Sequence, residues 1–185
     1  MATPPSKNPC QGVRGFKETG RSRYITDAEF DQVKAQAHFT VADAMDLALL
    51  TGQRPADVLK LKRTDIRDGA LWIVQNKTGA RLGIEITGEL AATIATINDR
   101  PRRAISVYLI QNENSQPLTQ CALRSRFDKA CTLAKVDFQF RDIRAKAATD
   151  TGDLAHSQKL LAHKNREMTE HCVKARMGER VKPLR

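Results

Sequence analysis

Apolar residues recur at helical spacing along most of this chain, and several of the helical stretches start or stop at a clear sequence signal. Thr26 and Glu29 have the spacing of a capping box, in which each side chain accepts a hydrogen bond from the other residue's backbone amide. A second helix is expected to open at Thr40 and to end at Gly52. Pro55 suits the first position of a short helix, because its missing N–H is not needed there.

Strand-like patterns are fewer and shorter than the helical ones. Two strands are predicted over residues 70–74 and 81–86, joined by the turn Asn-Lys-Thr-Gly, and residues 105–110 form an apolar run typical of a short buried strand. Further helices are predicted over residues 88–97, 119–134, 141–149, 153–163 and 166–176. We therefore expect a mainly α domain with a small antiparallel β-sheet on one side, an α+β fold.

The two ends of the chain lack this periodicity. Residues 1–23 are rich in proline, glycine and basic residues, which indicates a linker or extended arm. Residues 177–185 form a basic tail that contains Pro183 and should not continue the last helix. The periodic part, residues 24–176, has a length that suits one domain with its own hydrophobic core.

The charge of the chain narrows the choice of partner. Its 185 residues include 31 Lys and Arg against 21 Asp and Glu, a formal net charge of +10. Such a surplus on a small domain favours a polyanion, because neutralising phosphates releases condensed counterions. Solubility alone is the other interpretation of the charge. With aromatic residues at only 5%, a large ligand-stacking surface is not expected, and nucleic acid is the predicted partner.

Cysteine usage and hydropathy indicate the compartment. The four cysteines, Cys10, Cys121, Cys131 and Cys172, form neither a C-x-x-C pair nor a small disulfide framework. The sequence contains no apolar stretch of membrane-spanning length and no signal-like N-terminus, so we predict a cytoplasmic protein with reduced thiols and no membrane partner. A zinc site at His163, His171 and Cys172 is not expected, because adjacent residues of a helix cannot easily face one ion.

Four segments carry the residues suited to chemistry on a phosphate. They are TGQRPADVL (Thr51–Leu59), QNKTGARLGIEIT (Gln75–Thr87), FRDIRAKAATDTG (Phe140–Gly152) and LLAHKNREMTEHCVK (Leu160–Lys174). In this order and at these separations they resemble the catalytic domain of the phage integrases, the tyrosine recombinases. The resemblance implies that family's catalytic-domain fold, duplex DNA as partner, a tetrameric assembly with other recombinase subunits, and strand cleavage through a 3′-phosphotyrosyl link without metal or other cofactor. It also places a DNA-binding domain upstream, which this sequence lacks, so we expect a fragment or remnant of a longer protein.

The resemblance also implies six catalytic positions. The family pattern has an arginine after Thr-Gly-x, a lysine in a β-hairpin, a His-x-x-Arg pair, a Leu-x-His and a tyrosine nine residues later. The corresponding residues here are Arg54, Lys77, Arg141, Arg144, His163 and Cys172. Two of them depart from the pattern, since an arginine stands in place of the first histidine and a cysteine in place of the tyrosine. We expect all six to converge around one basic pocket.

The arginines are suited to holding the phosphate. A guanidinium matches two phosphate oxygens at once, and Arg54 lies at the mouth of a predicted helix, where backbone amides also favour an anion. Asp57, one turn further on, is predicted to hold Arg54 in place. Arg141 and Arg144 are three residues apart on a predicted helix and so should share a face. Arg141 cannot accept a proton, because a guanidinium stays charged at any working pH.

The remaining positions concern proton transfer and DNA contact. In the resemblance, the hairpin residue Lys77 protonates the 5′ leaving oxygen, with Lys62 and Arg81 as nearby alternatives that are also expected to contact DNA. The same resemblance makes His163 a hydrogen-bond donor to the phosphate, whereas a lone histidine near a helix end is otherwise more often a C-cap. Lys164, next to it, is predicted to contact DNA as well.

Cys172 decides whether the chain cleaves DNA. A thiolate is a poorer nucleophile than a phenolate towards phosphorus, and its sulfur lies roughly 4 Å closer to the backbone than a tyrosine hydroxyl, judged from bond lengths. Neither Tyr24 nor Tyr108 lies in a nucleophile motif. We therefore predict an integrase catalytic domain that binds DNA without cleaving it. A degenerate binding module that occupies recombination sites and an unrelated helical nucleic-acid-binding domain are the alternatives.

Overall fold

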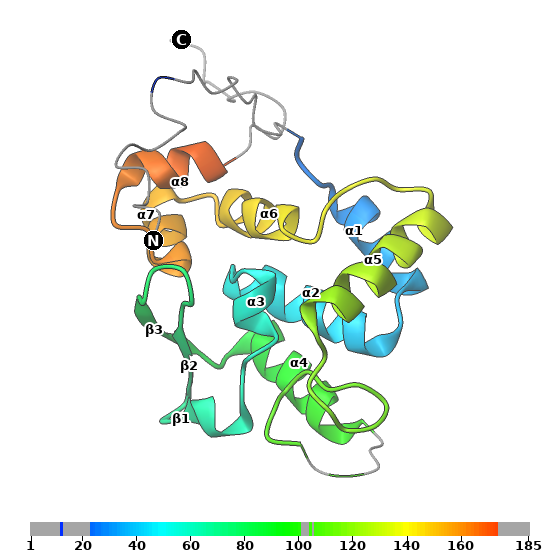
Figure 1. Cartoon of the computed structure of the whole chain (residues 1–185). Helices are drawn as coiled ribbons and strands as arrows, with labels where there is room; N and C mark the ends of the chain where they lie inside the picture. The colour runs from blue at the N-terminus through cyan, green and yellow to red at the C-terminus, as the bar shows by residue number, and fades with distance from the viewer. Residues whose placement is uncertain (1–11, 13–22, 101–103, 105, 174–185) are drawn as a thin grey trace, which may run out of the picture.

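The computed structural model describes Gly12 and residues 23–100, 104 and 106–173. Within this part the elements are α1 (Asp27–Gln36), α2 (Phe39–Thr51), α3 (Pro55–Val58), the 3-10 helix η1 (Arg63–Asp65), β1 (Ile66–Arg67), β2 (Ala70–Val74), β3 (Arg81–Glu85), α4 (Gly88–Asp99), α5 (Gln120–Ala134), α6 (Asp142–Asp150), α7 (Leu154–Leu161) and α8 (Arg166–Cys172). The predicted mainly α fold with a small antiparallel sheet is confirmed (Figure 1). The predicted arm, apart from Gly12 and Arg23, and the predicted basic tail lie outside the described residues.

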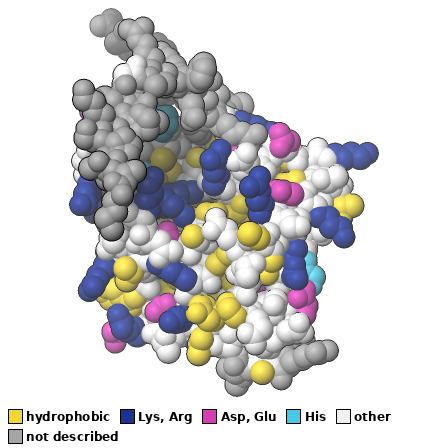
Figure 2. All heavy atoms as spheres, viewed as in Figure 1, with side chains coloured by type: hydrophobic (Ala, Val, Ile, Leu, Met, Phe, Trp, Pro, Cys, Tyr) yellow, Lys and Arg dark blue, Asp and Glu magenta, His cyan; other side chains and the backbone are white. Residues whose placement is uncertain are grey.

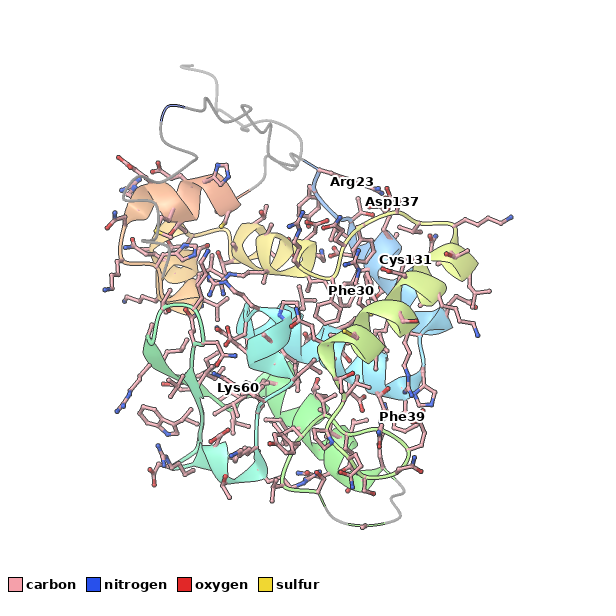
Figure 3. All side chains as sticks on the ribbon, viewed as in Figure 1. Arg23, Phe30, Phe39, Lys60, Cys131 and Asp137 are labelled. Atoms are coloured by element: carbon pink, nitrogen blue, oxygen red, sulfur yellow. The ribbon has the colours of Figure 1, made fainter. Side chains whose placement is uncertain are left out.

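The first helix starts as predicted. Glu29 N donates to Thr26 Oγ1 at 3.2 Å and Thr26 N donates to Glu29 Oε2 at 2.9 Å, which completes the capping box. The hydrogen bond from the Thr26 amide is the main reason why the pKa of Glu29 is lowered. Arg23 donates both to Glu29 and to the carbonyl of Asp137, so the start of α1 is tied to the segment after α5 (Figure 3).

Helix α2 is the centre of the core and packs against α1, α3, α4, α5 and α6. Its buried apolar residues are Val41, Ala44, Met45, Leu47 and Ala48. The helix begins at Phe39, one residue earlier than predicted, because the His38 ring caps it by accepting from Thr40 N at 3.4 Å. It ends at Gly52, as predicted, with a φ of 64°.

The sheet lies to one side of the helices and has the order β1-β2-β3, antiparallel throughout (Figure 1). Its buried face is formed by Leu71 and Ile73 of β2. Strand β1 was not predicted, because two residues are too few to show an alternating pattern. The β2–β3 turn points towards α7, and this brings the hairpin next to the C-terminal helices (Figure 1).

The predicted strand over residues 105–110 is wrong. In the described part of that segment only Tyr108 pairs with another strand-like residue, in an isolated bridge to Lys62. Leu109 N donates to Leu61 O at 2.8 Å, and Arg63 N donates to Val107 O at 2.8 Å. The pairing stops there because the partner segment turns at once into η1, so no ladder can continue.

Aromatic packing fixes the segment that leads into α6. Helix α5 begins after Thr119, whose side chain caps it as predicted, and contributes the buried Phe127. The Phe127 ring meets those of Phe138 and Phe140 edge-on, with centroids 5.3 Å apart in both cases. The connection between α5 and α6 is therefore anchored to the core just before the second arginine-bearing motif.

The last two helices are shorter than predicted. Helix α7 ends at Leu161, because Ala162 adopts a left-handed conformation with a φ of 51° and turns the chain away. Helix α8 ends at Cys172, where Val173 is already extended. Both boundaries matter for function, since they place His163 just beyond one helix and Cys172 at the end of the next.

We expect Phe127→Ala to lower the free energy of unfolding by about 3–5 kcal/mol, because it removes a fully buried ring together with two edge-on aromatic contacts. Leu133→Ala on the same helix is the control; Leu133 is 56% exposed, so its loss should cost no more than about 0.5 kcal/mol. Urea unfolding followed by circular dichroism measures both. Equal midpoints for the two variants would contradict the proposed anchoring role of the ring.

Candidate active site

Arg144 is a buried guanidinium held by neutral acceptors. It extends from α6, is 7% exposed, and donates from Nη1 to Gly52 O and from Nη2 to Leu161 O, the latter at 2.9 Å. Among the described residues, no carboxylate is in ion-pair contact with it, although the charge of Asp57 acts on it from further away and raises its pKa. Its pKa is lowered to about 10, first by burial and then by repulsion from Arg54, so the group stays protonated at neutral pH. The positive charge is thus left free to attract an anion.

His163 faces this guanidinium. Arg144 Nη2 lies 3.1 Å from His163 Nε2, and His163 Nδ1 lies 3.1 Å from Oγ1 of the buried Thr169. Because a guanidinium can only donate, Nε2 must accept, which leaves the proton on Nδ1 to be donated to Thr169. The pKa of His163 is lowered to about 4, first by burial and then by the positive charges of Arg144 and Arg54. The imidazole is therefore neutral at neutral pH.

Arg54 belongs to the same electrostatic cluster. It is the half-buried residue that precedes α3, and Pro55 occupies the first helical position as predicted. Its charge lowers the pKa of both Arg144 and His163, and its Nη1 donates to Gln75 Oε1 at 3.4 Å. Two guanidiniums and an imidazole therefore lie close together without a neutralising carboxylate bound to them.

Asp57 does not hold Arg54 through a hydrogen bond, contrary to our prediction. The carboxylate is buried, its Oδ1 accepts from Asn76 N at 2.7 Å, and Lys60 Nζ lies 3.5 Å from the same oxygen. Its Oδ2 has no hydrogen-bond partner among the described residues. Lys60, which follows α3 and is labelled in Figure 3, also donates to the side chain of Asn76. Asp57 thus fixes the β2–β3 turn, in which Asn76 immediately precedes Lys77.

Cys172 is the half-buried last residue of α8, a helix that packs against α6 and α7. Its thiolate would raise the pKa of Arg144, so the sulfur lies within electrostatic reach of that guanidinium. Thr169, one turn earlier on α8, contacts His163. Four of the six predicted catalytic residues are therefore brought together: Arg54, Arg144, His163 and Cys172.

The predicted lysines and Arg81 are surface cations. Lys77 lies exposed in the β2–β3 turn, and Arg81 is the exposed first residue of β3. Lys164 is exposed directly after His163, and Lys62 is exposed with its ammonium 5.8 Å from the ring centroid of Tyr108. Figure 2 shows a band of Lys and Arg side chains across the face where α6 and α7 lie in Figure 1. Such a band suits a phosphate backbone.

Arg141 occupies a different environment from Arg144. It is the exposed N-cap residue of α6 and lines an open groove together with Pro55 and Phe138. The two arginines differ in exposure, since Arg141 is exposed and Arg144 is buried, and their sharing of one face stays a prediction. Their one hydrogen bond in the described structure joins Arg144 N to Arg141 O at 3.3 Å.

Sequence reasoning missed two buried glutamines, Gln53 and Gln75, which are each 1% exposed. Both lie inside the quoted motifs, one directly before Arg54 and the other two residues before Lys77. A glutamine in a polar segment gives no signal of burial, because the pattern of apolar positions does not include it. The only indication was the position of both residues within motifs that carry charged site residues.

The part of the chain that the structure describes has neither a metal site nor a membrane-spanning helix. It contains no group of three or more His, Cys, Asp or Glu residues that could hold a metal ion. His163 is engaged instead with Arg144 and Thr169. No described helix is both long and apolar enough to cross a membrane.

Sequence comparison identifies related proteins. Residues 26–178 match the Phage integrase family. The chain is 28% identical over 190 residues to the prophage integrase IntE of Escherichia coli (strain K12), and 30% identical over 177 residues to the integrase of Escherichia phage HK022. These alignments cover 90% and 87% of this chain but 50% and 49% of the two relatives, so the chain spans about half the length of the curated relatives it matches.

Comparison with solved structures also finds phage integrases. A lambda integrase tetramer bound to a Holliday junction is similar with a TM-score of 0.80 at 24% identity, covering 92% of this chain and 53% of that one. The lambda integrase catalytic core is similar with a TM-score of 0.68 at 25% identity, covering 77% of this chain and 92% of that one. The predicted catalytic-domain fold is therefore confirmed.

We expect His163 to titrate with a midpoint near pH 4, as measured by NMR of its ring nitrogens. Because this folded-state pKa lies below the unfolded value of about 6.5, acid protonates the unfolded chain first. The contribution of this residue to the free energy of unfolding should be complete above pH ~6.5 and should decline towards pH ~4. In His163→Gln this part of the pH dependence should disappear, with His156→Gln on the exposed side of α7 as the control for loss of an imidazole. A midpoint near 6.5 would show that His163 is not held beside Arg144.

Proposed function

The chain belongs to the phage integrase family, and we propose that residues 24–176 form the catalytic domain of a site-specific recombinase that binds duplex DNA. The observation that carries the proposal is the cluster of Arg54, Arg144 and His163, which contains no bound carboxylate. Such a cluster is suited to one phosphate, because guanidiniums pair with its non-bridging oxygens in a water-poor site.

The geometry indicates how a phosphate would engage the histidine. In the structure Nε2 of His163 accepts from Arg144, so it has no proton to donate. A phosphate would draw the Arg144 donor towards its own oxygens, and its negative charge would favour protonation of the imidazole. Nε2–H could then donate to the phosphate, which is the role that the family resemblance implies for His163.

The other proposed roles follow from position. Lys77, on the turn fixed by Asp57 and Lys60, would protonate the 5′ oxygen as it leaves. In an intact site a tyrosine oxygen would form the new bond to phosphorus, giving a 3′-phosphotyrosyl link. Cys172 occupies that position, and Arg141 offers electrostatic help only. We therefore propose that this chain binds DNA with little or no cleavage, and a non-catalytic module that occupies recombination sites is the second candidate.

Partners and compartment are proposed from the relatives. Lambda integrase has been crystallised as a dimer bound to a COC′ core site and as a tetramer bound to a Holliday junction. We propose that this chain likewise works beside other recombinase subunits on DNA. We also propose a cytoplasmic location, which its similarity to phage integrases supports, and a reaction that uses no cofactor.

DNA binding by the chain should be electrostatic and nearly independent of sequence. If the domain neutralises about 5 phosphates, the slope of log K against log salt concentration should be near −4.5, from about −0.9 per phosphate. Arg144→Ala, once circular dichroism shows that it is folded, should weaken binding only modestly, since it removes one phosphate contact among several. Fluorescence anisotropy with labelled duplexes at several salt concentrations measures both. A flat salt response would contradict a DNA role for the positive surface.

Restoring the tyrosine should restore covalent chemistry. Cys172→Tyr would place a phenol beside a phosphate held by Arg54, Arg144 and His163, so a covalent adduct with nicked duplexes of randomised sequence should exceed the level of the parent. Adding Arg141→His should raise it further, since each recovered acid–base or electrostatic partner is typically worth about 10²–10³ in rate. Denaturing gels measure the adduct.

The control is Cys121→Tyr, which adds a phenol at an exposed position of α5 and should give no adduct. Mass spectrometry of the parent with the same DNA tests the thiol, because a phosphothioester at Cys172 would show that the chain cleaves as it is. If the double variant folds and binds DNA but forms no adduct, residue 172 is not the nucleophile position.

A further inference from the structure

Two buried glutamines connect the hairpin to the first arginine. Gln75 Nε2 donates to Gln53 Oε1 at 2.8 Å, and both residues are 1% exposed. Gln75 Oε1 accepts from Arg54 Nη1 at 3.4 Å and from Thr78 Oγ1 at 2.8 Å. Thr78 directly follows Lys77 in the β2–β3 turn. One amide oxygen thus contacts both the arginine and the turn that bears the proposed general acid.

The same pair reaches the end of α7. Gln53 Nε2 donates to Leu160 O at 3.1 Å, and Gln75 Nε2 donates to Leu161 O at 3.0 Å. The Leu161 carbonyl also accepts from Arg144 Nη2 at 2.9 Å. The two site arginines are therefore joined through one glutamine side chain and one peptide carbonyl, although they lie on separate helices.

We propose that Gln75, supported by Gln53, is a positioning residue of the anion site: it sets Arg54 relative to Arg144 without neutralising either charge. The inference rests on the proposed function, because it assumes that a phosphate binds between these arginines. Arginines are most often held by carboxylates, but a carboxylate here would compete with the phosphate for the same donors. An amide oxygen accepts the hydrogen bond and leaves the positive charge intact.

The hydrogen bonds of the Gln75 side chain support a positioning role over a role in core packing alone. Its two acceptor sites and two donors are all used, by Arg54, Thr78, Gln53 and Leu161. A carboxylate has the same shape but no donor, so it would face the oxygens of Gln53 and Leu161 without a proton to share. Only an amide satisfies all four partners at once.

The test uses the full chain with inorganic phosphate as the probe. NMR signals of the Arg144 Nε–H and the His163 ring report binding, and Gln75→Met is compared with the parent because it keeps the volume but loses every hydrogen bond. We expect the phosphate affinity of Gln75→Met to fall about 10-fold, at the low end of the range for losing a residue that orients a ligand. Gln75→Glu should fall further, since it keeps the acceptor and adds a negative charge.

Ser157→Ala is the matched control. The Ser157 hydroxyl is also buried and fully bonded, donating to Ala148 O at 2.6 Å, but it does not contact either site arginine. This variant should lose stability yet bind phosphate as the parent does. Arg54→Met combined with Gln75→Met should bind no more weakly than Arg54→Met alone, because the glutamine acts through the arginine.

The outcomes separate the two proposals. If phosphate leaves the parent's Arg144 and His163 signals unchanged, there is no anion site, and both the proposed function and this inference fail. If the parent binds phosphate and Gln75→Met binds equally well, the inference alone is overturned. Equal affinities for Gln75→Met and Gln75→Glu would refute the argument for neutrality. Should Gln75→Met not fold, Gln53→Met removes the supporting partner and gives the same comparison.

Discussion

The structure depends on one buried guanidinium. Arg144 connects the end of α2, through Gly52 O, to the end of α7, through Leu161 O, and its charge depresses the pKa of His163. Burying a charge without a carboxylate in direct contact costs stability, and the three neutral acceptors and the more distant charge of Asp57 offset only part of that cost. An anion bound beside Arg144 would therefore stabilise the fold, and this is the position where the proposed chemistry places a phosphate.

The helices and the sheet position the residues around Arg144 in different ways. The apolar helix α2 supplies the rigid centre to which α6 is packed, so Arg144 has little freedom to move. The sheet brings the β2–β3 turn to the cluster, where Asp57 accepts a hydrogen bond from Asn76 and Gln75 accepts one from Arg54. In the proposed function, a firmly held arginine and an exposed lysine on a surface turn act on the same phosphate.

Much of the fold was predictable because local rules decided it. The Thr26 capping box, Pro55 at the start of α3 and the Asn-Lys-Thr-Gly turn require only neighbouring residues. The predictions that were wrong concern features that depend on contacts between residues far apart in the sequence. The prediction of a strand over residues 105–110 was wrong because its partner segment turns into η1. Asp57 binds the β2–β3 turn through Asn76, which is 19 residues further along the chain. Motif spacing identified the clustered residues, whereas the different surroundings of Arg141 depend on where α6 begins.

Two of the acceptors that hold Arg144 are peptide carbonyls, and this affects how the site tolerates sequence change. A side-chain substitution at Leu161 leaves its carbonyl in place, so alanine scanning would not reveal the contribution of this acceptor. Gly52 differs, because its φ of 64° strains any other residue and an added Cβ would lie 3.1 Å from Leu161 Cδ2. Arg144 is thus held partly by backbone carbonyls, and the position of one of them depends on the left-handed conformation of Gly52.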